Sequence, residues 1–194
     1  MKITDAKKSD APLIARSVMD AIGTEICEDL ACNGKTLADV ELLFTILAER
    51  EDTQYSYLNT LVAVDEDGKS AGVIVSYDGA KLNELRKPFF EAVKTILDKN
   101  LEGVGDETDA SEFYLDTLAV LPEYRRLGLG RKMMDAMTDY ARVNRASAVS
   151  LEVRESNLAA RNLYESCGFA AEAVRKGYYH CPSEDAVIMW NRAL

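Results

Sequence analysis

The sequence is poor in proline, in histidine and in long apolar runs. Its 194 residues include 4 prolines and 1 histidine, and charged side chains interrupt every apolar stretch well before membrane-spanning length. Residues 1–5 lack the hydrophobic core of a signal peptide. These absences argue against a low-complexity chain and predict a globular protein that is cytoplasmic and binds no membrane.

Closely paired cysteines are missing as well. Cys27, Cys32, Cys167 and Cys181 show no C-x-x-C spacing, and the one histidine is His180. A zinc site would need an unusual set of ligands, because structural zinc sites combine closely spaced cysteine and histidine pairs. We therefore expect reduced thiols and no bound metal.

Positive charge is the minority charge of this chain. It has 23 Lys and Arg against 33 Asp and Glu, a formal net charge of −10 at pH 7. This balance argues against binding to nucleic acid or to anionic membranes. It suits a cationic acceptor, although an acidic surface that simply keeps the protein soluble explains it too.

The chain does contain alternating helical and strand-like patterns. Helices are expected near 12–22, 37–47, 82–97, 129–140 and 158–167, and strands near 3–4, 58–64, 71–77, 113–121, 148–153, 169–174 and 186–190. Pro88 should kink or restart its helix, and Gly23 weakens the end of the first one. A strand, helix and strand over 113–153 imply a parallel crossover. We predict an α+β fold with a mixed sheet, in one domain over residues 1–194.

A glycine-rich loop follows the strand at 113–121. It reads Arg125-Arg126-Leu127-Gly128-Leu129-Gly130, and a helix begins immediately afterwards. Glycines let backbone amides approach a phosphate, and a helix start adds free N–H groups and the positive end of the dipole. Arg131 and Lys132 add further charge. The loop matches neither a P-loop nor a dinucleotide fingerprint, and on its own a solvated turn would explain it as well.

Several motifs in order resemble the GNAT superfamily of N-acetyltransferases. They are Leu118-Ala119-Val120, Arg125-x-x-Gly128-x-Gly130, Leu151-Glu152-Val153-Arg154, Ser156-Asn157 and Leu163-Tyr164-Glu165-Ser166-x-Gly168-Phe169. The stretch from Arg175 to Met189 is similar to the branch that acetylates the N-terminal amine of a ribosomal protein. The likeness is clear from about Glu112 onward and covers only the order of elements before that. It implies a splayed mixed sheet flanked by helices.

The resemblance also implies roles for individual residues. The main chain of Leu118, Ala119 and Val120 would contact the pantetheine arm and acetyl carbonyl of acetyl-CoA, and the loop residues Arg125, Arg126, Leu127, Gly128, Leu129, Gly130 and Arg131 would hold its pyrophosphate. Asn157 would contact the pantetheine chain. Tyr164 would protonate the departing thiolate, and Glu152 would be the general base.

Other roles for the two catalytic candidates are open. Glu152 alternates with Leu151 and Val153 and fits a polar residue on the wet face of a strand equally well. Tyr164 fits a core aromatic of an amphipathic helix, although its place after Asn157 favours catalysis.

Further residues are candidates for binding the acceptor. Glu112 and Asp116 share one face of their strand and could bind a cationic acceptor or serve as base instead. Tyr178 and Tyr179 could line the acceptor site or pack in the sheet.

The pattern departs from the family between the third and fourth strands, where 79–111 replace a tight turn. We expect a helical part and then an acidic loop, with Leu85, Phe89, Phe90 and Val93 buried against the chain's own helices or against another subunit in a homodimer. The expected activity is acetyl transfer from acetyl-CoA to a primary amine by direct attack in a ternary complex. The acceptor is a small amine or a protein N-terminus, the acyl-chain length is open, and the alternative is a catalytically idle acyl-CoA-binding regulator.

Overall fold

A computed structural model describes residues 1–101, 105–180 and 183–194, without the side chains of residues 179, 180 and 183. The strands are β1 (Lys2–Asp5), β2 (Thr60–Val64), β3 (Ser70–Asp78), β4 (Glu112–Val120), β5 (Ala148–Arg154), β6 (Ala170–His180) and β7 (Ser183–Asn191). The helices are α1 (Ala11–Ile22), α2 (Thr24–Leu30), α3 (Leu37–Glu49), α4 (Leu82–Leu85), α5 (Lys87–Leu97), α6 (Leu129–Val143) and α7 (Leu158–Ser166). The expectation for Cys181 lies outside the described residues.

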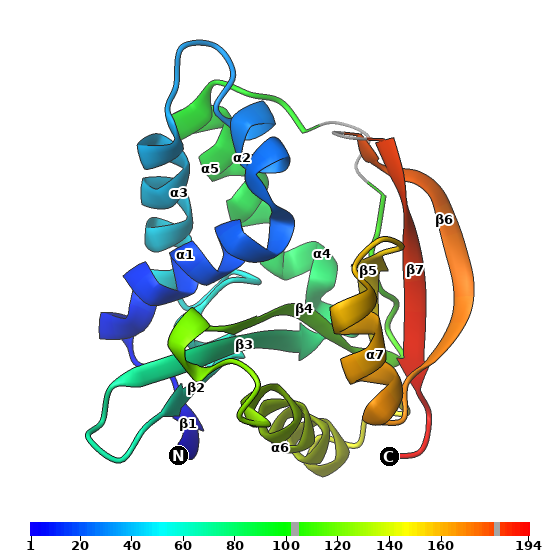
Figure 1. The fold of residues 1–194 in the computed structure, drawn as a ribbon. Coiled ribbons are helices and arrows are strands. Elements are labelled where there is room, and N and C mark those ends of the chain that lie inside the picture. Colours follow the sequence, from blue (N-terminus) through cyan, green and yellow to red (C-terminus); the bar gives the residue numbers. More distant parts are fainter. Residues whose placement is uncertain (102–104, 181–182) are drawn as a thin grey trace.

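The strands form one mixed sheet in the order β1-β2-β3-β4-β5-β7-β6. Every neighbouring pair is antiparallel except β4 and β5, which are parallel. That pairing covers only Glu112–Leu115 against Ala148–Leu151. Beyond Leu115 the two strands separate, so the sheet opens into two wings (Figure 1). The predicted fold class, including helices inserted between the third and fourth strands, is confirmed.

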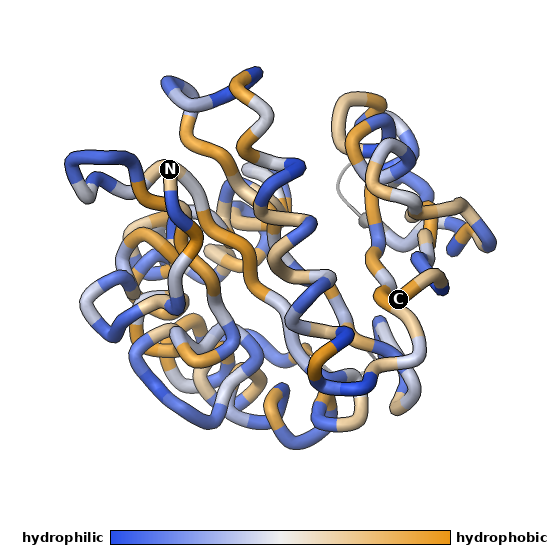
Figure 2. Tube along the Cα trace, turned by 90° about the horizontal axis from the view of Figure 1, so that it is seen from below, coloured by the Kyte–Doolittle hydropathy of each residue, from blue (hydrophilic) through white to orange (hydrophobic). Residues whose placement is uncertain are grey.

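Helices cover both faces of the sheet. Figure 1 shows α1, α2, α3 and α5 on one side of β3 and β4, with α6 on the other side. Each side of the sheet has its own apolar core, as expected from alternation along a strand. The first core includes Val73 and Val75, and the second core includes Ile74. The central strands are mainly hydrophobic and the peripheral loops hydrophilic (Figure 2).

Local sequence explains several helix boundaries. Thr36 caps α3 in a capping box with Asp39, whose carboxylate accepts from the Thr36 backbone N–H at 2.7 Å. Gly23 has a φ of 91°, a left-handed value that ends α1 and separates it from α2. Pro88 lies in the first turn of α5, so the predicted restart of the helix is confirmed.

Three details differ from the sequence-based expectation. Residues 175–180, which lie between the strands expected near 169–174 and 186–190, belong to β6, where the register shifts and Gly177 takes a φ of 59°. The helix expected near 129–140 extends to Val143, and its Tyr140 is 48% exposed. The strand expected from Leu58 begins at Thr60, after a short 3-10 turn. Spacing alone misses the continuation of β6 and the later start of β2, because one bulge or turn changes which side chains face the core.

The insert between β3 and β4 packs inside this chain. Val93 and Leu97 of α5 are fully buried in the first core, and the Phe89 ring stacks on Phe44 of α3 with centroids 6.2 Å apart. Leu85 packs beside Tyr77 in a third apolar cluster. The predicted apolar stripe is therefore covered by the chain's own elements. None of the described helices is long and apolar enough to cross a membrane.

Candidate functional site

The separation of β4 from β5 leaves backbone groups of β4 without a strand partner. The Leu121 N–H donates to the Ala71 carbonyl at 2.9 Å, toward β3. Successive N–H groups of a strand point to opposite edges, so those of Leu118 and Val120 face the open edge, and Ala119 faces β3. The Val120 carbonyl accepts from Arg125 Nε at 2.9 Å. The backbone N–H and carbonyl of Leu118 and the N–H of Val120 are therefore free to bind a ligand.

The glycine loop places helix N–H groups beside this open edge. Arg126 and Gly128 adopt left-handed φ values of 62° and 74°, and α6 begins at the next residue. The N–H groups of residues 129–131 have no partner within the helix, since the first such bond runs from Lys132 to the Gly128 carbonyl at 3.2 Å. The result is a set of convergent donors at a helix N-terminus, which suits a phosphate.

The loop's cations divide into two pairs. Arg125 is held by the Val120 carbonyl, and Arg131 donates to the Ser166 carbonyl at 2.6 Å. Within the described part of the chain, Arg126 and Lys132 form no ion pair, and both are exposed. Arg125 and Arg131 keep their positive charge but are tied to neutral carbonyls, whereas the side chains of Arg126 and Lys132 remain available to contact an anion directly.

Glycine is required at the two positions of the loop for different structural reasons. At Gly130 an added Cβ would come within 3.1 Å of Leu163 Cδ2, so Gly130 lets α6 approach α7. At Gly128 an added Cβ would meet nothing within 4 Å, but the positive φ disfavours any side chain. Leu127 is exposed beside Gly128, whereas Leu129 is buried in the second core.

Asn157 and Tyr164 both belong to α7. Asn157 caps the helix through its Oδ1, which accepts from the Ala160 N–H at 3.2 Å, so its Nδ2 is the group left for a ligand. Tyr164 is 9% exposed, with its ring 6.1 Å from that of Phe169. Burial raises the pKa of Tyr164 to about 12. Its hydroxyl, which has no hydrogen-bond partner among the described residues, therefore stays protonated at neutral pH.

Glu152 lies on the opposite face of β5 from its apolar neighbours. Its side chain is only 2% exposed, and its Oε1 lies 3.0 Å from Arg175 Nη2. Burial raises the pKa of Glu152 to about 7, while Arg175 and a hydrogen bond from Tyr178 act to lower it. The alternative of a solvated strand residue is wrong, because only 2% of the side chain is exposed and Arg175 of β6 lies against its carboxylate.

Asp116 occupies a β-bulge at the point where β4 leaves β5. Thr117 pairs with Val75 and Leu115 with Ser76, so Asp116 is the extra residue. Burial is the main reason that the pKa of Asp116 rises to about 7, and repulsion from Glu107 adds to it. Asp116 is thus a second carboxyl that can exchange a proton near neutral pH.

Glu112 has a different environment at the other end of β4. Its carboxylate accepts from Ser150 Oγ at 2.6 Å, from Thr108 Oγ1 at 2.9 Å and from Trp190 Nε1. These donors fill its acceptor positions and tie β4 to β5 and β7. Such a carboxylate is less open to an incoming amine than Asp116.

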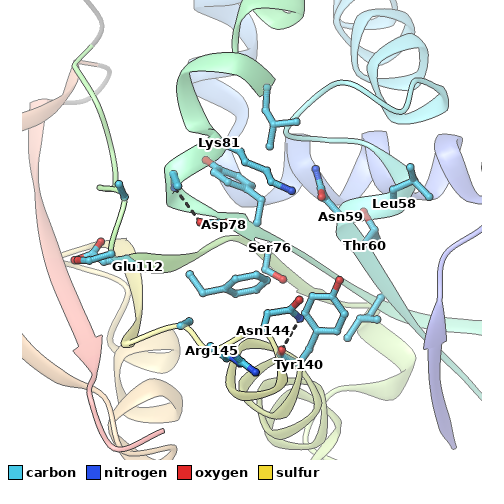
Figure 3. Close-up of a pocket in the computed structure, with 18 of the residues that line it drawn as sticks. Leu58, Asn59, Thr60, Ser76, Asp78, Lys81, Glu112, Tyr140, Asn144 and Arg145 are labelled. Carbon is cyan, nitrogen blue, oxygen red and sulfur yellow. Dashed lines mark hydrogen bonds between the residues drawn. The ribbon is translucent and has the colours of Figure 1, made fainter.

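A cavity of about 700 Å³ lies at this same end of β4 (Figure 3). Its lining includes Asp78, Lys81, Glu112, Tyr140 and Arg145. None of the predicted cofactor-binding residues, all of which lie in the described part of the chain, lines it. The cavity is therefore separate from the open edge of β4, and we assign it no part in cofactor binding.

Other site residues were not singled out from the sequence. Gln54, Arg86 and Glu107 reach the region of Asp116 and Glu152 from distant segments and belong to no short motif. Arg175, quoted only within a motif, is the ion-pair partner of Glu152. The Arg175 guanidinium carbon lies 4.9 Å from the centroid of the Tyr178 ring. The side chain of Tyr179 lies outside the part of the chain that the structure describes.

Comparison with known proteins agrees with this arrangement. Residues 37–169 match the family described as Acetyltransferase (GNAT) family. The chain is 42% identical over 80 residues to the [ribosomal protein bS18]-alanine N-acetyltransferase of Escherichia coli K12, covering 40% of this chain and 54% of that protein. It thus spans about half the length of that curated relative. The Haemophilus ducreyi protein of the same name is 33% identical over 123 residues, with 62% and 80% covered.

A solved structure described as an acetyltransferase superposes over the full length of both chains. Its TM-score is 0.77 and its sequence identity 26%. Together with the family match over residues 37–169, this likeness covers the open edge of β4, the glycine loop and α7. The chain belongs to the GNAT family of acetyltransferases.

Proposed function

We propose that this protein transfers an acetyl group from acetyl-CoA to a primary amine within a ternary complex. The observation that carries the proposal is the unpaired edge of β4 at Leu118–Val120, which lies between the helix N-terminus of α6 and the wing that carries Glu152. A strand edge of this kind can bind an extended amide-containing chain by backbone hydrogen bonds. The pantetheine arm of CoA has that chemistry.

Acetyl-CoA would lie along this edge from the loop to the acetyl group. Its pyrophosphate would accept from the N–H groups of residues 129–131 and face Arg126 and Lys132. Its amides would meet Leu118 and Val120, with Asn157 Nδ2 as a further donor. Among the described residues, these backbone and side-chain groups either have no hydrogen-bond partner or keep at least one N–H free to donate.

Glu152 and Tyr164 suit the two proton transfers. They lie on opposite faces of the sheet, so a thioester threaded between β4 and β5 would have the base on one side and the acid on the other. Glu152, directly or through water, would take the proton that the amine loses as its nitrogen bonds the acetyl carbon. A free β4 amide would stabilise the developing oxyanion. The C–S bond would break, and Tyr164 would protonate the thiolate.

Direct attack fits these residues better than a covalent acyl-enzyme. Cys167 follows α7 three residues after Tyr164, and burial raises the pKa of its thiol. A protonated thiol is a poor nucleophile. An initial-velocity study with both substrates varied should therefore give intersecting rather than parallel lines.

The acceptor class is tested with a panel. Two relatives are named for the alanine of ribosomal protein bS18, so a peptide with an N-terminal alanine belongs in it beside small primary amines. Acetylation of a panel member together with release of CoA supports the proposal. Tight CoA binding without transfer to any amine would contradict it and favour an acyl-CoA-binding regulator.

A further inference from the structure

Three carboxylates meet where the insert faces β4 and β5. Glu107 of the insert raises the pKa of both Asp116 and Glu152 by repulsion, and all three raise the pKa of the buried Tyr114. We call Glu107, Asp116 and Glu152 the acidic cluster. Glu107 is fixed there by Tyr77, whose hydroxyl donates to it at 2.8 Å.

Two members of the cluster have cationic partners and the third does not. Arg175 pairs with Glu152 at 3.0 Å, and Arg86 Nη1 lies 3.7 Å from Glu107 Oε2. Asp116 forms no ion pair with any described residue, and its hydrogen bonds come from Thr117 and Gln54. Arg86 also pairs with the half-exposed Asp106, so the three carboxylates of the cluster share less than two full positive charges. At least one negative charge is therefore uncompensated when all three are ionised.

Gln54 provides an independent sign of a missing ligand. It is 2% exposed, and its Nε2 makes long hydrogen bonds to Glu107 Oε1 at 3.4 Å and Asp116 Oδ2 at 3.5 Å. Its Oε1 is buried and accepts no hydrogen bond from any described residue. An unsatisfied buried acceptor is costly, so an N–H donor beside Asp116 would stabilise this arrangement.

We propose that Glu107, Asp116 and Gln54 bind a second cationic group of the acceptor, an ammonium or guanidinium a short chain away from the reacting amine. The inference rests on the proposed function. The reacting amine is neutral when it attacks, so it cannot compensate the cluster at that stage. A second cation carries several N–H donors, which can serve the Asp116 carboxylate and Gln54 Oε1 together.

The insert thereby gains a role in specificity. Arg86 and Glu107 both lie within 79–111, and Arg86 also donates to the Gly105 carbonyl at 2.9 Å, which holds the loop that carries Glu107. Gln54 is positioned from the same side, because its N–H donates to the Leu85 carbonyl at 3.3 Å. Glu107 is accordingly a specificity-determining residue rather than a catalytic one.

The experiment compares matched acceptors on the parent protein and on Glu107→Gln, Asp116→Asn and Glu84→Gln. One pair is putrescine and butylamine, and the other is alanyl-lysine amide and alanyl-norleucine amide. The parent should favour the cationic member of at least one pair by about tenfold or more in kcat/KM, since hydrogen bonds to charged groups are strong. The preference should largely vanish in the first two variants. Glu84 is an exposed carboxylate of the insert, so Glu84→Gln should keep it.

Calorimetric titration of the same acceptors into the CoA-bound proteins separates recognition from turnover. A cation preference in affinity that Glu107→Gln or Asp116→Asn removes supports cation binding by these residues even without acetylation, a result that would contradict only the proposed function. Equal kcat/KM and equal affinity within both pairs would overturn the proposed cation binding, as would a preference that survives in both variants. Acetylation of butylamine would then leave the proposed function standing. The pair that shows the preference distinguishes a diamine from a peptide.

Discussion

Arg175 Nη2 lies 3.0 Å from Glu152 Oε1, so the ion pair reaches from β6 to β5 across the intervening β7. This contact partly offsets the effect of burial on Glu152, whose pKa is raised to about 7. The guanidinium thus acts to keep Glu152 ionised near neutral pH, which is the state a general base requires.

The first prediction concerns Arg175→Gln. Since the guanidinium lowers the pKa of Glu152, its removal should raise that pKa further. Activity that needs ionised Glu152 rises with pH through this pKa, so the acidic limb of the kcat/KM profile should move to higher pH. Arg192→Gln, which breaks the exposed pair with Glu172, is the matched control. An unmoved acidic limb in Arg175→Gln would remove Glu152 from the titration that governs activity.

The second prediction concerns Tyr164→Phe. The variant loses only the hydroxyl, which forms no hydrogen bond with any residue in the described part of the chain. The ring should therefore still pack beside Phe169. We expect turnover to fall ~10²–10⁴-fold, the usual contribution of general acid catalysis, with nearly unchanged CoA affinity and thermal stability. Saturating rate, CoA titration and thermal unfolding on one preparation test this. A near-parental rate would mean that another group protonates the thiolate.

The third prediction separates the two loop glycines. Gly128→Leu puts a side chain at a left-handed residue that faces open space, so it should abolish CoA binding at a cost of about 1–2 kcal/mol in stability. Gly130→Leu instead forces a side chain against Leu163, so it should lower the free energy of unfolding more strongly. Denaturant unfolding and CoA calorimetry on both variants measure the difference. Retained CoA affinity in a folded Gly128→Leu protein would contradict the phosphate cradle.

The fourth prediction concerns the stability contributed by Asp116. Its carboxyl titrates at about 7 in the folded protein but near 4 when unfolded, so the unfolded state ionises first and stability falls as pH rises between these values. Asp116→Asn removes this penalty. It should stabilise the protein by up to about 4 kcal/mol at about pH 8 and by little at about pH 4. Denaturant unfolding at the two pH values tests it, and a variant less stable than the parent at the higher pH would contradict a half-buried carboxyl without a cationic partner.

Much of the fold follows from local sequence. Thr36 and Asp39 define the start of α3, Pro88 restarts a helix, and the glycine loop begins α6 where the spacing predicts it. These features depend on residues a few positions apart, so the sequence states them directly. The opening of the sheet between β4 and β5 could be expected only through the family resemblance.

The acceptor side could not be predicted in the same way. Asp116 is the extra residue of a bulge, which alternation along β4 cannot reveal. Gln54 and Glu107 are 53 residues apart and meet only because the insert folds back onto β4. The environment of Glu152 includes Arg175, which lies 23 positions away in the sequence, so its isolated strand pattern wrongly allowed a solvated position.

The most direct test of the account is to incubate the protein with acetyl-CoA and the amine panel and to measure CoA release and acceptor mass together. The account predicts that an acceptor gains one acetyl group for each CoA released and that Tyr164→Phe slows both by the same factor. CoA binding at the glycine loop with neither product, or CoA release without an acetylated amine, would contradict it.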